Sequence, residues 1–234
     1  MPFSVHRLDM ARVNLQGQYN PPDFLDTRIG VYAYLVLAGS NIILVDTGVG
    51  TGNAHIEATF APTTTSIIDE LARFEIAASE VGVVANTHLH FDHCGNNRLF
   101  RNAKILVQNR ELEVARETNY TVRNWFDYDA AQLVPVDGDL EVCPGVKLLF
   151  TPGHTPGHQS VLVESPTDRL LIAAQAAYTA DEYQRGGDPG TQAHRGLERE
   201  YVQSIERLKD LGADEVYFSH DSLAVYAGEC TTNR

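Results

Sequence analysis

Residues 87–94 read THLHFDHC, and this stretch places His88, His90, Asp92 and His93 within six positions. Grouped histidines seldom serve packing, because each buried ring nitrogen must find a hydrogen-bond partner. Imidazole and carboxylate together form a ligand set that suits zinc, and also iron, manganese or cobalt. For so dense a cluster, a metal site is favoured over ordinary surface or core roles.

Other histidines follow apolar runs of strand length later in the chain. His154 and His158 come after VKLLF, and His220 comes after EVYF. Because strand ends gather at one edge of a sheet, these side chains can converge on the first cluster. Side chains two apart on an extended segment point the same way, so His88 and His90 can hold one ion while the acidic residue and the next histidine turn toward a second. Three protein ligands per ion leave room for water, as in catalytic zinc sites.

The elements that must position these residues are short apolar runs separated by turns. Runs rich in β-branched and aromatic side chains predict strands at 31–37, 41–45, 81–86, 104–107, 146–150, 159–164, 169–174 and 215–218. The turn AGSN joins the first two as a hairpin, and the second leads into DTG. This grouping favours a layered sheet sandwich covered by helices over a doubly wound parallel sheet. We expect one domain over 1–234.

Helical spacing appears in three places. One helix is expected from Ser66, with Ile67, Leu71 and Phe74 on its buried face. The others are expected at 110–117 and 198–210, and Gly212 is placed to end the last of them.

The least regular stretch, about 118–145, carries four aromatic residues among polar ones, namely Tyr120, Trp125, Phe126 and Tyr128. Loops on a scaffold commonly shape substrate pockets, and aromatic side chains also anchor long loops to a core. Both roles stay open at this point.

Composition excludes several classes of function. The formal net charge is −13, from 31 acidic and 18 basic residues, and no block of Lys and Arg overrides it, so nucleic acid and anionic lipid surfaces are disfavoured as partners. The N-terminus shows no signal-peptide pattern, and no apolar run approaches a membrane span. Three scattered cysteines, Cys94, Cys143 and Cys230, favour a reducing cytoplasm, although one bridge with one free thiol is the alternative. The sequence leaves a homodimer open.

The motifs together resemble those of the metallo-β-lactamase superfamily. THLHFDH carries its H-x-H-x-D-H signature, and DTG at 46–48, PGH at 152–154 and SHD at 219–221 follow in the family's order. The resemblance spans nearly the whole chain. It implies an α/β four-layer αβ/βα sandwich with mixed sheets and the metals at one edge of the paired sheets.

Carried over position by position, the resemblance implies one or two bound ions, with zinc expected first. The first ion would be held by His88, His90 and His154. The second would be held by Asp92, His93 and His220. Asp46 would orient ligands without binding metal. Spacing alone leaves His154 and His158 open, and only the resemblance selects His154.

Within the superfamily, HFDHCGNN, AAYTADEY and FSHD look most like the N-acyl homoserine lactonase branch. In that branch a tyrosine three residues after a bridging aspartate contacts the substrate carbonyl, which implies this role for Tyr178; packing at a strand end is the alternative. The bridging aspartate itself is replaced by Gln175, and Asp181 is too distant along the chain for an easy substitution. A neutral amide compensates metal repulsion less, so we expect a weaker second metal, a single metal, or two metals bridged only by hydroxide or an anion.

The expected activity is hydrolysis of a lactone, with an N-acyl homoserine lactone as the first compound to test. Metal-bound hydroxide would attack the ester carbonyl, Tyr178 would donate a hydrogen bond to the oxyanion, and Asp92 would shuttle the proton to the leaving alkoxide. One rival is a thioesterase resembling glyoxalase II, for which the 14 residues after His220 leave little room for a glutathione-binding region. β-Lactam cleavage is disfavoured by the missing secretion signal. A non-catalytic ligand-binding protein that keeps the metals is the rival from another class.

Overall fold

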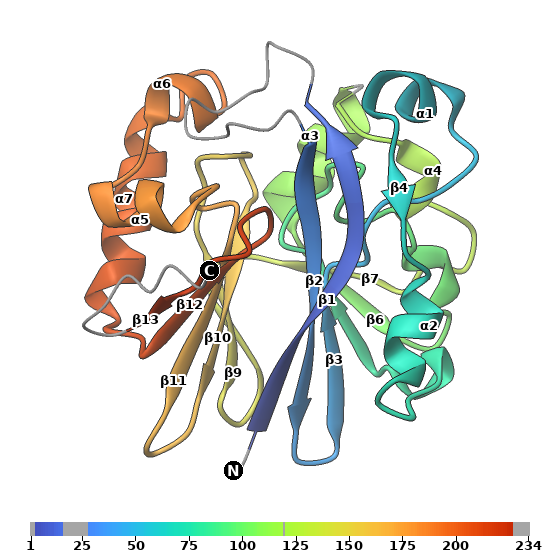
Figure 1. The fold of residues 1–234 in the computed structure, drawn as a ribbon, viewed down its shortest axis with the longest axis horizontal. Helices are drawn as coiled ribbons and strands as arrows, with labels where there is room; N and C mark the ends of the chain where they lie inside the picture. The colour runs from blue at the N-terminus through green and yellow to red at the C-terminus, as the bar shows by residue number, and fades with distance from the viewer. Residues whose placement is uncertain (1–2, 16–27, 119, 227–234) are drawn as a thin grey trace.

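The computed structural model describes residues 3–15, 28–118 and 120–226, which form two sheets packed face to face between two layers of helices (Figure 1). One sheet has seven strands and the other six. Both contain parallel and antiparallel pairs, so both are mixed, as the resemblance implied.

The first sheet comes from the N-terminal half of the chain. In spatial order its strands are β4 (Thr63–Thr64), β1 (Phe3–Asn14), β2 (Arg28–Ala38), β3 (Asn41–Val45), β5 (Val83–Ala85), β6 (Lys104–Gln108) and β7 (Leu133–Val136). Strands β3, β5, β6 and β7 are parallel neighbours. Their carboxyl ends therefore lie along one edge of this sheet.

The second sheet comes from the C-terminal half. In spatial order its strands are β13 (Val225–Tyr226), β12 (Glu215–Phe218), β11 (Arg169–Ala174), β10 (Gln159–Glu164), β9 (Val146–Phe150) and β8 (Leu140–Cys143). Strand β10 is antiparallel to both β9 and β11, and β11 is parallel to β12. The carboxyl ends of β9, β11 and β12 therefore share one edge.

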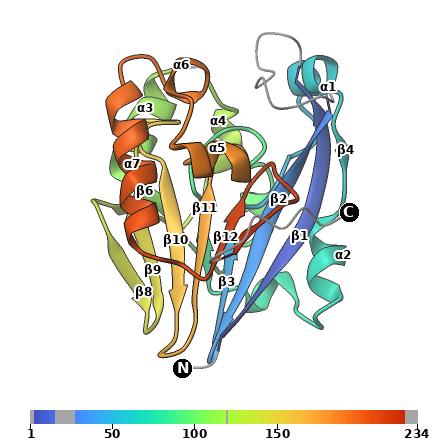
Figure 2. The same cartoon turned by 60° about the vertical axis from the view of Figure 1, so that its left-hand side comes forward.

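Helices cover the outer faces of both sheets (Figures 1 and 2). Against the first sheet lie α1 (Ala54–Phe60), α2 (Ile67–Ala72), α3 (Asn109–Glu117) and α4 (Arg123–Phe126), and against the second lie α5 (Ala180–Arg185), α6 (Pro189–Gln192) and α7 (Glu198–Asp210). Short 3-10 turns occupy Ala78–Glu80 and Asn97–Leu99. Three buried apolar clusters fill the spaces between the layers. This is the expected four-layer αβ/βα sandwich.

The two sheets are joined by hydrogen bonds between β2 and the end of β12. The backbone N–H of Tyr32 donates to the carbonyl of Ser219 at 2.9 Å, and the buried Tyr34 hydroxyl donates to the carbonyl of Phe218 at 2.5 Å. These bonds bring the carboxyl edge of the second sheet against the first.

Most of the predicted elements are confirmed within two or three residues. Ser66 caps α2, its hydroxyl accepting the backbone N–H of Asp69 at 3.3 Å, but the helix ends at Ala72, so Phe74 lies beyond it. Gly212 follows the end of α7 with a φ of 60°, a left-handed conformation that glycine adopts without strain.

The description of 118–145 as the least regular stretch is wrong, because β7, β8 and the short helix α4 lie in it. Its aromatic side chains divide between the two roles that the sequence left open. Trp125 and Phe126 are buried in the core beneath the first sheet, and Tyr128 packs against it. Tyr120 also packs against that core and lines the cavity described below.

Two further expectations concern cysteines and membranes. Cys94 and Cys143 are free thiols, and Cys230 lies outside the described residues. Over the ranges that the structure describes, each helix is too short or too polar to cross a membrane.

Candidate metal centre

The loops that follow β3, β5, β9, β11 and β12 meet at one edge of the sandwich. They carry, in the same order, Asp46, the cluster at 88–93, His154, Gln175 and His220. The parallel course of β3 with β5, and of β11 with β12, explains why residues so far apart in sequence converge.

The first group of donors is His88, His90 and His154. Nδ1 of His90 lies 2.9 Å from Nε2 of His88 and 3.1 Å from Nε2 of His154. Tetrahedral coordination at about 2.0–2.1 Å places ligand nitrogens roughly 3.3 Å apart. The three imidazoles are therefore spaced as ligands of one ion would be.

The second group is Asp92, His93 and His220. Oδ2 of Asp92 lies 3.6 Å from Nε2 of His93 and 3.5 Å from Nε2 of His220. Within each of the two groups, all the donor atoms lie within 4.8 Å of one another. The six side chains thus form the two sets that the resemblance implied, and their role as ligands stays a prediction.

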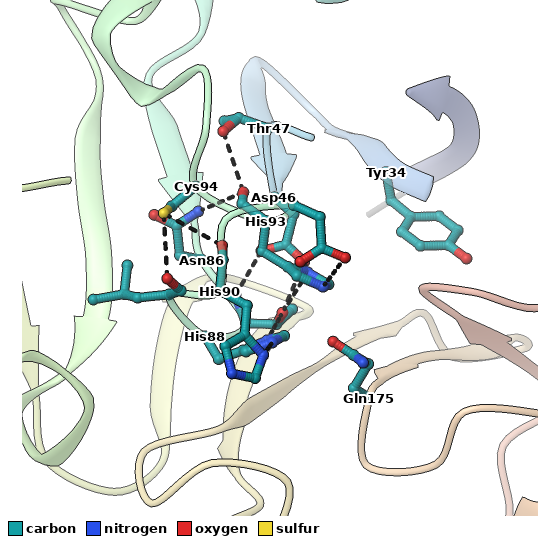
Figure 3. Close-up of polar contacts among 12 residues, drawn as sticks. Tyr34, Asp46, Thr47, Asn86, His88, His90, His93, Cys94 and Gln175 are labelled. Atoms are coloured by element: carbon teal, nitrogen blue, oxygen red, sulfur yellow. Dashed lines mark hydrogen bonds and ion pairs between the residues drawn. The ribbon is translucent and has the colours of Figure 1, made fainter. Parts of the chain in front are cut away.

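Asp46 fixes the orientation of His93 (Figure 3). Its carboxylate accepts hydrogen bonds from the backbone N–H and the hydroxyl of Thr87 at 2.8 and 2.7 Å, and it contacts Nδ1 of His93 at 2.7 Å. Nε2 of His93 is thereby directed into the site. Nδ1 of His220 is held in the same manner, 2.7 Å from the carbonyl of Gly30.

Two buried polar atoms at the site find no hydrogen-bond partner among the described residues, namely Nε2 of His93 and Oε1 of Gln175. An unpaired buried acceptor costs free energy, and a cation between the groups would satisfy both atoms. Three imidazoles in one set and two imidazoles with a carboxylate in the other are ordinary donors for divalent zinc. The residues present therefore fit a metal.

Burial sets the protonation of the first group. Desolvation lowers the pKa of His90 to about 4, and it holds the pKa of His88 and of His154 well below the ordinary value, with the neighbouring histidines acting in the same direction. These imidazoles are neutral near pH 7, which is the form that binds metal.

In the second group, charge opposes burial. Desolvation lowers the pKa of His220 to about 4. Burial alone would lower the pKa of His93, but the carboxylates of Asp92 and Asp46 outweigh burial, so the pKa of His93 is raised. Burial alone would raise the pKa of Asp92, but the nearby His93, His220 and His90 outweigh burial, so the pKa of Asp92 is lowered. Asp92 is therefore ionised and suited to face a cation.

Gln175 follows β11 directly and is 1% exposed. Figure 3 shows its side-chain amide directed toward the cluster of histidines and Asp46. Its backbone N–H donates to Nε2 of His158 at 3.2 Å, while Nδ1 of His158 lies 3.0 Å from the carbonyl of Thr151. His158 therefore supports the loop from outside both donor groups. Asp181 does not replace the missing carboxylate, because it is exposed and paired with Arg185 at 2.9 Å.

A cavity of about 410 Å³ opens above the two groups. Its polar floor includes His90, Asp92, Gln175, Tyr178 and His220, and its walls include the apolar side chains of Leu15, Ile29, Ile56, Phe60, Phe91 and Val122. The Tyr178 ring stacks on His220 at 5.3 Å and packs edge-on against His154 at 5.5 Å. Tyr178 thus lies between the two groups, facing the cavity.

Sequence reasoning missed several residues that hold the site together, including Thr87, Glu111 and Glu182. All three are buried: Thr87 donates to Asp46, Glu111 accepts from the backbone of Leu89 between His88 and His90, and Glu182 accepts from the backbone of Tyr178. The two glutamates give no signal in the sequence, because glutamates in a first helical turn are ordinary features of helices. Thr87 gives none because its role depends on its contact with Asp46, which is distant in the sequence.

Comparison with known proteins gives consistent matches. A family model described as the metallo-beta-lactamase superfamily matches residues 26–220. An N-acyl homoserine lactonase from Bacillus cereus is 33% identical over 231 residues, covering 92% of this chain and 88% of the relative. N-acyl homoserine lactonase AiiA from Bacillus thuringiensis subsp. kurstaki is 31% identical over 241 residues, with the same coverage.

Solved structures of N-acyl homoserine lactone hydrolases resemble the fold of this chain over most of its length. A quorum-quenching N-acyl homoserine lactone hydrolase superposes with a TM-score of 0.78 and 27% identity, covering 93% of this chain and 92% of that one. An N-acyl homoserine lactone hydrolase with the product N-hexanoyl-L-homoserine bound at its catalytic metal center gives a TM-score of 0.77 and 27% identity, covering 94% and 93% of the two chains.

Proposed function

The chain belongs to the metallo-beta-lactamase superfamily, and from that premise we propose that it is a metal-dependent lactonase that opens N-acyl homoserine lactones, a quorum-quenching hydrolase of EC 3.1.1 type. The observation that carries the proposal is the pair of three-residue donor groups beneath a cavity with an apolar wall. The groups suit ester hydrolysis, and the wall suits an acyl chain.

In this proposal the first group holds one divalent ion and the second group holds another, with zinc as the first candidate and manganese, iron or cobalt as alternatives. When bound, the ions polarise an ester carbonyl and lower the pKa of water to about 7. Asp46 keeps Nε2 of His93 directed at the site, and the carbonyl of Gly30 does the same for Nε2 of His220.

The residues of the chain supply the remaining steps. Tyr178 donates its hydroxyl proton in a hydrogen bond to the oxygen that gains charge when the carbonyl is attacked. Asp92 takes the proton that the attacking water loses and returns it to the ring oxygen as the ester C–O bond breaks. The products are one hydroxyl and one carboxylic acid, which releases its proton to the solvent, so the ring opens with the consumption of a single water. The apolar wall meanwhile keeps the acyl chain out of water.

The test combines metal analysis with hydrolysis of a panel of lactones and matched thioesters by the zinc-loaded chain. We expect turnover of N-acyl homoserine lactones, with the His88→Ala variant inactive and depleted in metal. Faster turnover of thioesters would assign the chain to the thioesterase alternative. Zinc binding without turnover of any ester would mean a ligand-binding protein.

We further propose that residues 1–234 form one domain, because each donor group draws on loops from both sheets. The free thiols of Cys94 and Cys143 support the cytoplasm as the compartment.

A further inference from the structure

Two glutamates that belong to neither donor group are buried beside the site. Glu111 on α3 is 0% exposed and Glu182 on α5 is 3% exposed. Full burial of a carboxylate is unusual unless the group is paired or hydrogen-bonded.

The carboxylate of Glu111 accepts four hydrogen bonds. Oε1 accepts the backbone N–H of Leu89 at 2.8 Å and the hydroxyl of Tyr120, while Oε2 accepts the hydroxyl of Thr155 at 2.7 Å and the backbone N–H of Gly157 at 3.0 Å. Burial raises the pKa of Glu111, and these hydrogen bonds oppose that shift. A carboxylate has about four lone-pair sites, so the four donors saturate its ionised form.

Three of these four partners belong to the loops that supply the first donor group. Leu89 stands between His88 and His90, and Thr155 directly follows His154. A single carboxylate therefore ties together two loops more than 60 positions apart in the chain, whose histidines His90 and His154 approach each other to 3.1 Å.

Close packing reinforces this link. A Cβ on Gly157 would lie 2.3 Å from the backbone nitrogen of Glu111, so only glycine permits the loop after His154 to approach α3 so closely. On the other side, the Tyr120 ring packs edge-on against His90 at 5.0 Å, and the hydroxyl of Thr121 donates to the carbonyl of Leu89. Leu89 is thus held at both its N–H and its carbonyl.

Glu182 makes a similar set of contacts at a different place. It accepts the backbone N–H of Tyr178 at 2.7 Å, the backbone N–H of Asp188 at 3.1 Å and the hydroxyl of Tyr201 at 2.5 Å. It therefore holds Tyr178, and none of these contacts involves one of the six expected metal ligands. Glu182 provides a matched control for the loss of a buried carboxylate.

We infer that Glu111 is a positioning residue for the first metal: its carboxylate fixes the spacing of the two loops that carry His88, His90 and His154, and so sets the affinity of that group. The inference rests on the proposal that this group binds a metal, and it does not depend on which ester is hydrolysed. Residues that orient metal ligands typically change metal affinity about 10- to 100-fold when mutated.

The experiment measures zinc affinity one group at a time, by competition with a chromophoric chelator. In a His220→Ala background only the first group is complete, and in a His154→Ala background only the second. We expect Glu111→Gln to weaken zinc binding about 10-fold or more in the first background and less than about 3-fold in the second. Thr155→Val removes one hydrogen bond to the same carboxylate, so it should also weaken zinc binding by the first group, but by less. This variant replaces Glu111→Gln in the test if Glu111→Gln does not fold.

Glu182→Gln should lower the urea midpoint of the metal-free chain but leave zinc affinity in the His220→Ala background unchanged. Equal weakening by the Glu111 and Glu182 variants, or no selective weakening by the Glu111 and Thr155 variants, would overturn the inference. If the parent chain binds zinc but opens no lactone, the proposed function fails while the affinities still decide the role of Glu111.

Discussion

Gln175 is the residue at which this chain departs most clearly from the lactonase pattern. It is buried, and its Oε1 has no hydrogen-bond partner in the part of the chain that the structure describes. A carboxylate at this point would neutralise part of the charge of two nearby dications, whereas an amide offers only a dipole. Among the six expected ligands, Asp92 therefore supplies the negative charge for the second metal.

We expect the Gln175→Asp variant to bind the second metal more tightly, because the added negative charge offsets the repulsion between the ions. Isothermal titration with zinc, combined with elemental analysis after dialysis, measures both affinity and stoichiometry. Gln175→Asn, which changes the length of the side chain without adding charge, is the control. A second site that is equally weak in all three proteins would contradict the electrostatic explanation.

Tyr178 lies between the two donor groups, against His154 and His220. Removing a hydrogen-bond donor to a developing oxyanion typically lowers kcat about 10²- to 10³-fold. We expect a fall of about 10²-fold for Tyr178→Phe, with KM and metal content nearly unchanged, since the ring contacts remain. An unchanged kcat would show that Tyr178 only packs at the end of β11.

At the scale of elements, β2 and β12 hold the two halves of the site together. The buried hydrogen bond from the hydroxyl of Tyr34 to the carbonyl of Phe218 joins them two residues before His220. Tyr34→Phe leaves that carbonyl unsatisfied, and we expect it to lower the free energy of unfolding by about 1–3 kcal/mol.

Urea denaturation of the metal-free protein measures this loss. Tyr217→Phe is the matched control, because the Tyr217 hydroxyl donates to the side chain of Glu215 within the same strand, and its loss should cost less. If the two variants lower the free energy of unfolding equally, the hydrogen bond between β2 and β12 contributes no more to stability than the one within β12.

Much of the fold could be predicted because its strands are short runs of β-branched residues whose ends are marked by turns. The strand β1 could not be assigned with the same ease, since its exposed face carries polar residues such as Arg7, Asp9 and Arg12 and a bulge shifts its register near Met10. The alternation of polar and apolar residues in that segment was nevertheless a signal for a half-buried strand. Pro135 made β7 equally hard to recognise, although proline is tolerated in an edge strand.

The candidate site likewise contains residues that the sequence predicts and residues that it does not. The donor groups could be predicted because histidines spaced as in THLHFDH are typical of a metal site and rare in ordinary packing. Of the residues that orient the ligands, Asp46 was expected from the resemblance, and the structure places it 2.7 Å from Nδ1 of His93. Glu111 and Thr87 could not be predicted, because their roles depend on contacts between loops that are distant in the sequence.

At the scale of the whole molecule, the buried histidines make stability depend on pH. Burial lowers the pKa of His90 and of His220 to about 4 and that of His158 to about 3, against an ordinary value near 6.5. The unfolded chain therefore binds protons at a higher pH than the folded chain, so stability falls as the pH drops from about 6.5 toward 4. The raised pKa values of His93, Glu111 and Glu182 act in the opposite direction, but the five buried histidines with a lowered pKa outnumber these three groups.

We expect the urea midpoint of the metal-free protein to fall steadily between pH 6.5 and pH 4.5 and to change little between pH 7 and pH 8. Because the groups are buried, added salt should not remove the effect. A flat profile below pH 6.5 would show that these histidines are protonated in the folded chain.

The order of the donors along the chain also affects how a nascent chain acquires its ions. Four donors emerge together at 88–93, but the first group waits for His154 and the second for His220, more than a hundred residues later. At ordinary rates of translation this interval is on the order of ten seconds. Stable metal binding must therefore follow assembly of the sandwich. An ion that binds earlier would be held only by the ligands at 88–93, and it could exchange readily with the solvent.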